Sequence, residues 1–303
     1  MNRVEQHSLF SERAALERMI ADTPAADVID LRSLQVRLEI INRALAQQTI
    51  ETRLPARARL TFRGRPVVGS HGIFAEFGMT ATKGFTDAIA LLAASLDTEL
   101  AATGPIPNRD QNQLLITSTA LGSFGFELEE HREQELPLEE ESSVAQALRQ
   151  AQALLRGAAA GSDDDLTDAA SGQDPRALAA MRAFLRTLVD NEAVCAVSVG
   201  DQAFSFSDVG EVQRSLARLG ENNLHEQPHP FSGVFQGALP KRRTFEFRVA
   251  ATAEVISGKI GPGVLDPAAL NHHLEQPTDI QLIETRVGEG RPRYVLNQLP
   301  NWT

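Results

Sequence analysis

The most regular pattern of hydrophobic and polar positions in this chain lies between residues 57 and 126. Along residues 57–63 apolar and polar side chains alternate, which is the period of a half-buried β-strand. Residues 67–77 suggest a second strand, with glycines that indicate a hairpin or a bulge. Apolar residues at helical spacing follow over residues 80–96, and residues 114–126 form another strand-like run. This order predicts a helix packed on one face of a small antiparallel sheet.

The N-terminal pattern is purely helical. Residues 9–48 predict two helices joined at Thr23-Pro24. In the second helix, apolar residues follow one another at alternating steps of three and four, as in the seam of a helical hairpin or a short coiled coil. Packing of this hairpin on the central unit is favoured over self-association, because so short a seam does not require a dimer. The predicted interaction seam consists of Leu31, Leu34, Leu38, Ile41 and Leu45.

The second half of the chain combines a linker-like segment with two further folded regions. Residues 157–173 are small and acidic and contain glycine and serine, a composition typical of a flexible linker. Asp174-Pro175 then predicts a helix start, followed by a hairpin and another helix. Residues 231–303 show three strand-like runs, a short helix and two more runs, the order of an OB-type barrel. A small SH3-like barrel is the alternative.

Together these patterns predict an α+β protein with an N-terminal helical hairpin, helix-on-antiparallel-sheet units and a C-terminal small β-barrel. With 303 residues the chain is long enough to form more than one core. The predicted boundaries are a helical hairpin at 1–52, a central α+β unit at 53–156, an acidic flexible linker at 157–173, a second α+β unit at 174–230 and the barrel domain at 231–303.

Cysteine usage and hydropathy indicate the compartment. The single cysteine, Cys195, excludes an intramolecular disulfide and a multi-cysteine zinc site, and it suits a reducing cytoplasm. The first twenty residues are interrupted by glutamates and lack the apolar core of a signal peptide. No run approaches the roughly 20 apolar residues that span a bilayer. We therefore expect a soluble, cytoplasmic protein without a membrane partner.

The net charge of −11 is unevenly distributed. Residues 127–174 hold 13 acidic residues and only three arginines, so the rest of the chain is close to neutral. Residues 53–65 contain five arginines and no acid. The overall charge therefore says little about binding partners, and the separation of charge says more.

The row of arginines on the first predicted strand is the most distinctive candidate site. Arg57, Arg59 and Arg63 project from one side of the strand, and Arg65 follows in the turn. Such a row could bind phosphates or a carboxylate-rich partner. The favoured interpretation is ordinary cross-strand pairing with acidic residues of a neighbouring strand. These acidic residues are Glu127, Glu129 and Glu130.

One stretch places a nucleophile beside a base, at Gly69-Ser70-His71-Gly72. Adjacent residues on a strand point to opposite faces, and the spacing is not that of a nucleophile elbow. A bulged strand with a hydrogen-bonded His71 is therefore favoured over a catalytic site. The histidine pairs lack a convincing metal-ligand setting, and the usual phosphate-binding motifs are missing. No catalytic residue, metal or cofactor is assigned.

A second basic cluster, Lys241-Arg242-Arg243, lies at a predicted hairpin turn of the barrel. OB barrels that bind single-stranded nucleic acid normally combine positive charge with aromatic side chains. Phe235, Phe245 and Phe247 are near enough in sequence to serve, although strand alternation would bury some of them. Nucleic acid is therefore a candidate partner for the barrel.

The function that these patterns favour is a non-catalytic, cytoplasmic protein-interaction or accessory subunit of a multi-component bacterial system, such as antiviral defence. Its helical hairpin and acidic segment would bind a protein partner or a second copy of the chain. One alternative is a nucleic-acid-binding accessory protein that acts through the barrel. Another alternative is a hydrolase centred on Ser70-His71.

Overall fold

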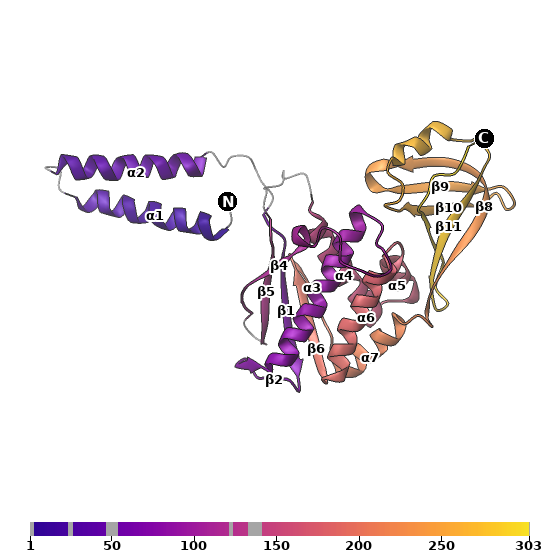
Figure 1. The fold of residues 1–303 in the computed structure, drawn as a ribbon, viewed down its shortest axis with the longest axis horizontal. Coiled ribbons are helices and arrows are strands. Elements are labelled where there is room, and N and C mark those ends of the chain that lie inside the picture. Colours follow the sequence, from indigo (N-terminus) through magenta and orange to yellow (C-terminus); the bar gives the residue numbers. More distant parts are fainter. Residues whose placement is uncertain (1–2, 24–26, 47–53, 121–123, 133–140, 303) are drawn as a thin grey trace. The chain divides into compact units, whose positions relative to one another are not determined.

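A computed structural model describes the chain at residues 3–23, 27–46, 54–120, 124–132 and 141–302 (Figure 1). The chain divides into two compact units. The first comprises residues 1–54 and 132–141, and the second comprises residues 55–131 and 142–303.

The first unit contains two helices that pack on each other, α1 (Arg3–Asp22) and α2 (Val28–Ala46) (Figure 1). Arg37 of α2 donates from Nε to Glu12 Oε1 of α1 at 2.9 Å. Leu16 and Ile41 are buried, with 5% and 4% of their surfaces exposed. Two helices were predicted in this region, and the first begins earlier than expected. The predicted packing of this pair on the central unit stays a prediction.

The second unit is built on a five-stranded antiparallel sheet of order β4-β5-β1-β6-β7. In chain order the strands are β1 (Arg57–Gly64), β4 (Leu114–Thr119), β5 (Phe124–Glu130), β6 (Ala193–Val199) and β7 (Gln202–Ser205). The alternation predicted for β1 is present, because Ala58, Leu60 and Phe62 all face the core and are buried. The α+β class predicted from the sequence is thereby confirmed.

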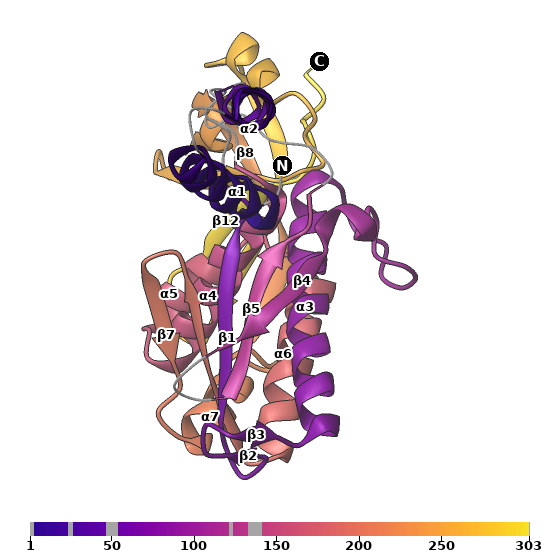
Figure 2. The same cartoon turned by 90° about the vertical axis from the view of Figure 1, so that its left-hand side faces the viewer.

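Four helices cover the apolar face of this sheet (Figure 2). They are α3 (Ala75–Asp97), α4 (Ser143–Ala159), α6 (Pro175–Asp190) and α7 (Val209–Arg218). The caps follow the sequence, since Ser142, Asp174 and Asp208 each accept a hydrogen bond from a backbone N–H of the first turn. Helix α3 begins at Ala75 rather than near residue 80. The short strands β2 (Val67–Val68) and β3 (Gly72–Ile73) precede it.

The two α+β units expected at 53–156 and 174–230 form one core. The reason is that β1 pairs with β5 on one side and with β6 on the other, with Leu60 opposite both Phe126 and Val197. Local periodicity indicated β1 and β6, but it merged β4 and β5 into one run over residues 114–126. It contains no information about the pairing of β1 with β6, about 130 residues away in the sequence. We refer to residues 55–131 and 142–223 as the body.

Residues 157–173, expected to be a flexible linker, instead contain the end of α4 and a further helix, α5 (Asp163–Ala170). Ser162 and Asp165 form a capping box at its start. Leu166 is fully buried, and Gly157 allows close approach, since an added Cβ would lie 3.2 Å from Leu166 Cα. Small residues therefore serve helix packing here, although their composition also resembles that of a linker.

The C-terminal region, described throughout residues 224–302, is a closed barrel of five strands in the order β10-β12-β11-β8-β9 (Figure 1). The strands are β8 (Leu224–Leu239), β9 (Thr244–Val249), β10 (Val255–Ile260), β11 (Thr278–Val287) and β12 (Arg293–Leu296). The predicted small barrel is confirmed, and the predicted helix is the 3-10 helix η3 (Pro267–His273). We refer to residues 224–302 as the barrel.

The barrel begins before residue 231, because the polar, proline-containing segment ahead of it is the first half of β8. Pro228 and Pro230 lie opposite Ile283 and Gln281 of β11. Pairing of β8 with β9 starts only at Gly233. Proline is tolerated where a strand has a neighbour on one side only, so this segment pairs despite its loop-like composition.

Candidate functional site

The barrel is held on the body by helix α5, whose acidic side chains meet basic side chains of the barrel. Asp168 forms an ion pair with Arg293. Lys259 donates from Nζ to the carbonyl oxygens of Ser171 and Asp168 at 2.8 and 3.1 Å. The backbone N–H of Arg291 donates to Asp164 Oδ1 at 2.6 Å. The acidic run therefore has an intramolecular role.

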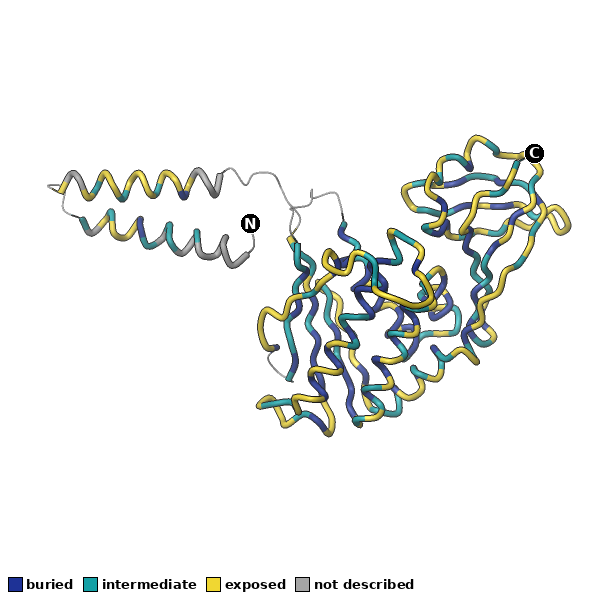
Figure 3. The backbone as a smooth tube through the Cα atoms, viewed as in Figure 1, coloured by how far each residue is buried: buried dark blue, intermediate teal, exposed yellow. Residues whose placement is uncertain are grey.

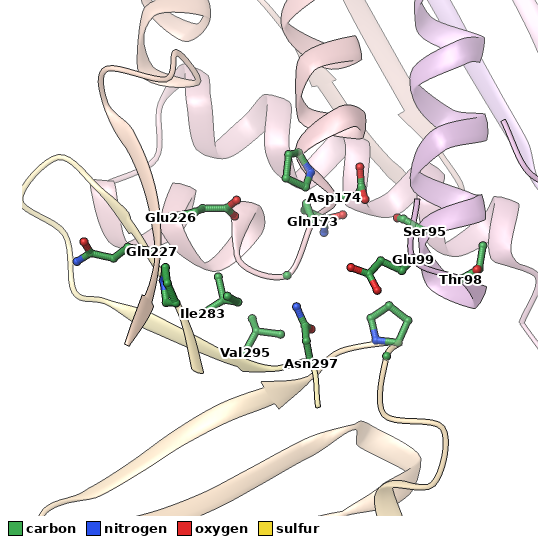
Figure 4. Close-up of a pocket in the computed structure, with 15 residues that line it drawn as sticks. Ser95, Thr98, Glu99, Gln173, Asp174, Glu226, Gln227, Ile283, Val295 and Asn297 are labelled. Atoms are coloured by element: carbon green, nitrogen blue, oxygen red, sulfur yellow. The ribbon is translucent and has the colours of Figure 1, made fainter. Parts of the chain in front are cut away.

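A pocket of about 300 Å³ lies beside this contact, between the body and the barrel. We call it the junction pocket. It is lined by the end of α3, the connection from α5 to α6, the first part of β8 and barrel residues near the end of β12 (Figure 4). Ile283 and Val295 give the barrel side an apolar surface, and amides and hydroxyls alternate with carboxylates around the rest.

Three carboxylates from separate segments line the junction pocket: Glu99, Asp174 and Glu226. In Figure 4 the carboxyl groups of Glu99 and Glu226 point toward the space between the body and the barrel. None of the lining residues is a lysine, arginine or histidine. The lining therefore suits a cationic or hydrogen-bond-donating group better than an anion.

The pKa of the Glu226 carboxyl group is raised by its surroundings. Although part of its side chain is exposed, crowding of the carboxyl group by the protein raises its pKa, and the negative charge of Asp174 acts in the same direction. Thr285 Oγ1 lies 3.5 Å from Glu226 Oε1 and opposes the rise by donating a hydrogen bond. A carboxyl group with a raised pKa beside a second carboxylate can hold a proton at a higher pH than an ordinary glutamate.

We expect the variant Glu226→Gln to be more stable than the wild type near neutral pH. The folded protein binds the Glu226 proton more tightly than the unfolded chain does. The stability that this proton contributes to the folded protein is therefore lost as the pH rises from the ordinary pKa of 4.5 through the raised value. Thermal unfolding across this range should show the advantage of the glutamine shrinking as the pH falls through the raised pKa toward 4.5, below which no advantage remains. Glu246→Gln, at an exposed carboxyl of the same barrel, is the control. A glutamine variant that is less stable at every pH would contradict the prediction.

Metal binding has no support in the described part of the chain, where no group of three or more His, Cys, Asp or Glu side chains is placed to hold an ion. Comparison with protein-family models, curated proteins and solved structures found no match. The site is therefore interpreted from its geometry alone. Among the described residues, no helix is both long enough and apolar enough to cross a membrane.

The predicted arginine row lies on the face of the sheet opposite the core, away from the junction pocket. Arg59 Nε lies 3.0 Å from Glu127 Oε1, and Arg57 forms an ion pair with Glu129. Both pairs follow the strand register, which places these residues directly opposite each other. Arg63 donates from Nη2 to the carbonyl oxygen of Phe206 at 3.1 Å. Arg57 and Arg59 of the row thus form cross-strand ion pairs. The role of the row in binding stays a prediction.

Two details of this row differ from the expected pairing. Glu130 points to the other face, because side chains alternate along β5, and its Oε2 accepts a hydrogen bond from Ala56 N at 2.9 Å. Arg65 lies in the turn and is 3.5 Å from Glu192, with 75% of its side chain exposed. Arg65 is therefore more accessible than Arg57 and Arg59, whose side chains are 44% and 41% exposed.

Ser70 and His71 lie in an exposed turn between β2 and β3, where His71 N donates to Val68 O at 3.0 Å. Gly69 adopts φ +55°, a conformation that side-chain-bearing residues rarely take, and this permits the turn. Neither residue lines the junction pocket. The solvent around this turn gives no sheltered environment for hydrolysis, and the hydrolase alternative stays a prediction.

The three residues of the basic cluster in the barrel have different roles. Lys241 and Arg242 are exposed on a 3-10 turn, η2 (Pro240–Arg242). Arg243 instead donates to the carbonyl oxygens of Ile260 and Val264 at 3.0 and 2.9 Å, and also to that of Gly261. The three nearby phenylalanines are all in the barrel core, with at most 2% of their surface exposed. They are Phe235, Phe245 and Phe247.

The predicted interaction seam is the more buried side of α2. Ile41 is buried, whereas Leu31, Leu34 and Leu38 are half-buried. The side chain of Leu45 lies outside the described residues. The seam is thus at least partly covered within the first unit.

Sequence reasoning did not identify the junction pocket. Its carboxylates lie at positions 99, 174 and 226, with no shared motif. Asp174 was recognised only as a helix cap, a role that it has through Oδ1 and the N–H of Arg176 at 2.8 Å. No local signal could have joined these three residues, because the contact between body and barrel creates the pocket.

Proposed function

We propose that this chain is a non-catalytic, cytoplasmic protein-interaction subunit of a multi-component assembly, and that its N-terminal helical hairpin binds the protein partner. The observation that carries this proposal is an apolar surface on α2 that the first unit leaves exposed. Val36 and Ile40 have 44% and 60% of their surfaces exposed. We call these two residues the outer stripe.

The outer stripe and the seam lie on different sides of α2. Residues four apart in a helix lie one above the other, so Val36 and Ile40 form a continuous apolar surface. The seam residues Leu31 and Leu38 point nearly opposite to it. Most described residues of α2 are exposed, as Figure 3 shows. Contiguous exposed apolar surface is one mark of a binding site.

The small amount of burial among the described side chains of α1 and α2 also supports a partner. Helices α1 and α2 contain 20 and 19 residues, and Leu16 and Ile41 are the fully buried apolar side chains among those described in them. Most helices in proteins are stabilised by tertiary packing of an apolar face rather than by intrinsic propensity. Covering the outer stripe with a partner would add such packing.

Nucleic-acid binding by the barrel is a second candidate function, favoured by two observations. Lys241 and Arg242 are exposed at the turn between β8 and β9. The barrel also supports an OB-type assignment over an SH3-like one, because a helix separates its third and fourth strands and its third strand, β10, pairs in parallel with the fifth, β12. The burial of Phe235, Phe245 and Phe247 removes the expected stacking residues, so this function ranks second.

The proposal is tested by the size of the assembly that the full chain forms in cell extract, measured before and after nuclease treatment. We expect a nuclease-resistant assembly whose mass falls in the double variant Val36→Ser/Ile40→Ser. Val255→Ser, which removes an equally exposed apolar side chain from the barrel, is the control and should leave the mass unchanged.

Two outcomes would contradict the proposal. If the double variant assembles like the wild type, the outer stripe is not the binding surface. If nuclease dissolves the assembly and Lys241→Ala/Arg242→Ala prevents its formation, the nucleic-acid function is correct instead.

A further inference from the structure

The outer stripe is framed by opposite charges. Arg32 lies four residues before Val36, one turn away, and Glu39 lies next to Ile40 and two turns after Arg32. All four side chains are exposed and lie on one side of α2. Within the described part of the chain, neither Arg32 nor Glu39 takes part in an ion pair, so both charges are available to a partner.

This order of charges makes the surface complementary to itself. We propose that the outer stripe binds the outer stripe of a second copy, with the two α2 helices antiparallel around a two-fold axis near Val36. A two-fold axis perpendicular to α2 brings the same surface of both copies together with the two helices running in opposite directions. Arg32 of each copy then lies at the level of Glu39 and Ile40 of the other, and two equivalent ion pairs flank the apolar contact.

The charges also argue against other arrangements. In a parallel pair, each Arg32 would face the other Arg32 and each Glu39 the other Glu39, which is repulsive. A strongly acidic or basic partner would be attracted by one charge and repelled by the other. A membrane surface favours a helix whose polar side is rich in lysine and arginine, which the position of Glu39 opposes. A second copy satisfies both charges at once.

This inference rests on the proposed function, since it names the partner of the same surface. The test is light scattering of the purified full chain after size exclusion, over a range of concentrations. We expect a dimer that Arg32→Glu and Glu39→Arg each weaken about tenfold in dissociation constant, because each reversal replaces two attractive pairs by two repulsive ones. The charge-swapped double variant Arg32→Glu/Glu39→Arg should recover the wild-type constant.

Mixing the two single variants provides a sharper test. A copy with Arg32→Glu and a copy with Glu39→Arg restore both attractive pairs, so the mixture should dimerise more tightly than either variant alone. Arg242→Glu, a reversal at an exposed arginine of the barrel, is the control and should dimerise like the wild type. Circular dichroism confirms that each variant keeps its helices, which is expected because the substituted residues are exposed.

Two results would overturn the inference. One is a purified chain that stays monomeric at every concentration, and the other is a dimer unaffected by either single reversal. If the purified chain is monomeric while Val36→Ser/Ile40→Ser still reduces the assembly in extract, the second copy is wrong but the proposed function stands. If neither experiment responds to changes in the outer stripe, the proposed function fails as well.

Discussion

Replacement of Phe85 by alanine is expected to lower the free energy of unfolding by about 3–5 kcal/mol. Phe85 lies in the middle of α3 with 0% of its surface exposed. Its ring meets that of Phe184 of α6 edge to face, with centroids 5.5 Å apart and an interplanar angle of 61°. Loss of the ring removes buried apolar surface and leaves a cavity between α3 and α6.

Chemical denaturation of the full chain measures this effect, with Met79→Ala as the control. Met79 lies on the same helix, but 74% of its surface is exposed, so its truncation should change stability by no more than about 0.5 kcal/mol. Equal losses in the two variants would show that the face of α3 carrying Phe85 does not form the core.

Replacement of Phe235 by alanine is expected to have a similar effect on the barrel, again about 3–5 kcal/mol. Phe235 is fully buried, and its ring contacts both Phe245 and Phe247, with centroid distances of 5.8 and 5.0 Å. These three rings come from β8 and β9 and occupy much of the interior of the barrel. Loss of the Phe235 ring leaves a cavity beside the rings of Phe245 and Phe247.

The matched control for the barrel is Leu265→Ala, because 92% of the surface of Leu265 is exposed. Thermal unfolding followed by the near-ultraviolet signal of Trp302, which packs against the barrel core, should shift to lower temperature in Phe235→Ala and not in Leu265→Ala. An unchanged transition in Phe235→Ala would mean that the aromatic cluster does not stabilise the barrel.

The arginine row shows how far sequence reasoning reaches toward the site. Alternation along β1 correctly places Arg57 and Arg59 together on the face away from the core. Their partners depend on the register with β5, which sets Arg57 opposite Glu129 and Arg59 opposite Glu127. Glu130, one residue later, is on the other face. Glutamates adjacent in sequence are therefore separated by the pleat of the strand.

The acidic segment shows where composition alone misleads. Four aspartates between residues 163 and 168 resemble a solvated linker, because such charges repel one another unless basic groups face them. In the folded chain Lys259, Arg291 and Arg293 face them, nearly 100 residues or more later in the sequence. Burial lowers the pKa of Lys259, and the charge of Asp168 opposes this shift.

The sequence by itself determined most of the helices and strands and the core-facing side of β1, because these follow from spacings of two to four residues, and the order of its strand-like runs indicated the small C-terminal barrel. It missed α5 and the first half of β8. Only the tertiary structure decided that β1 joins β6 in one sheet and that α5 holds the barrel. It also brought Glu99, Asp174 and Glu226 around one pocket. These features depend on contacts between distant segments, whose energies come from packing and charge pairing that no local pattern records.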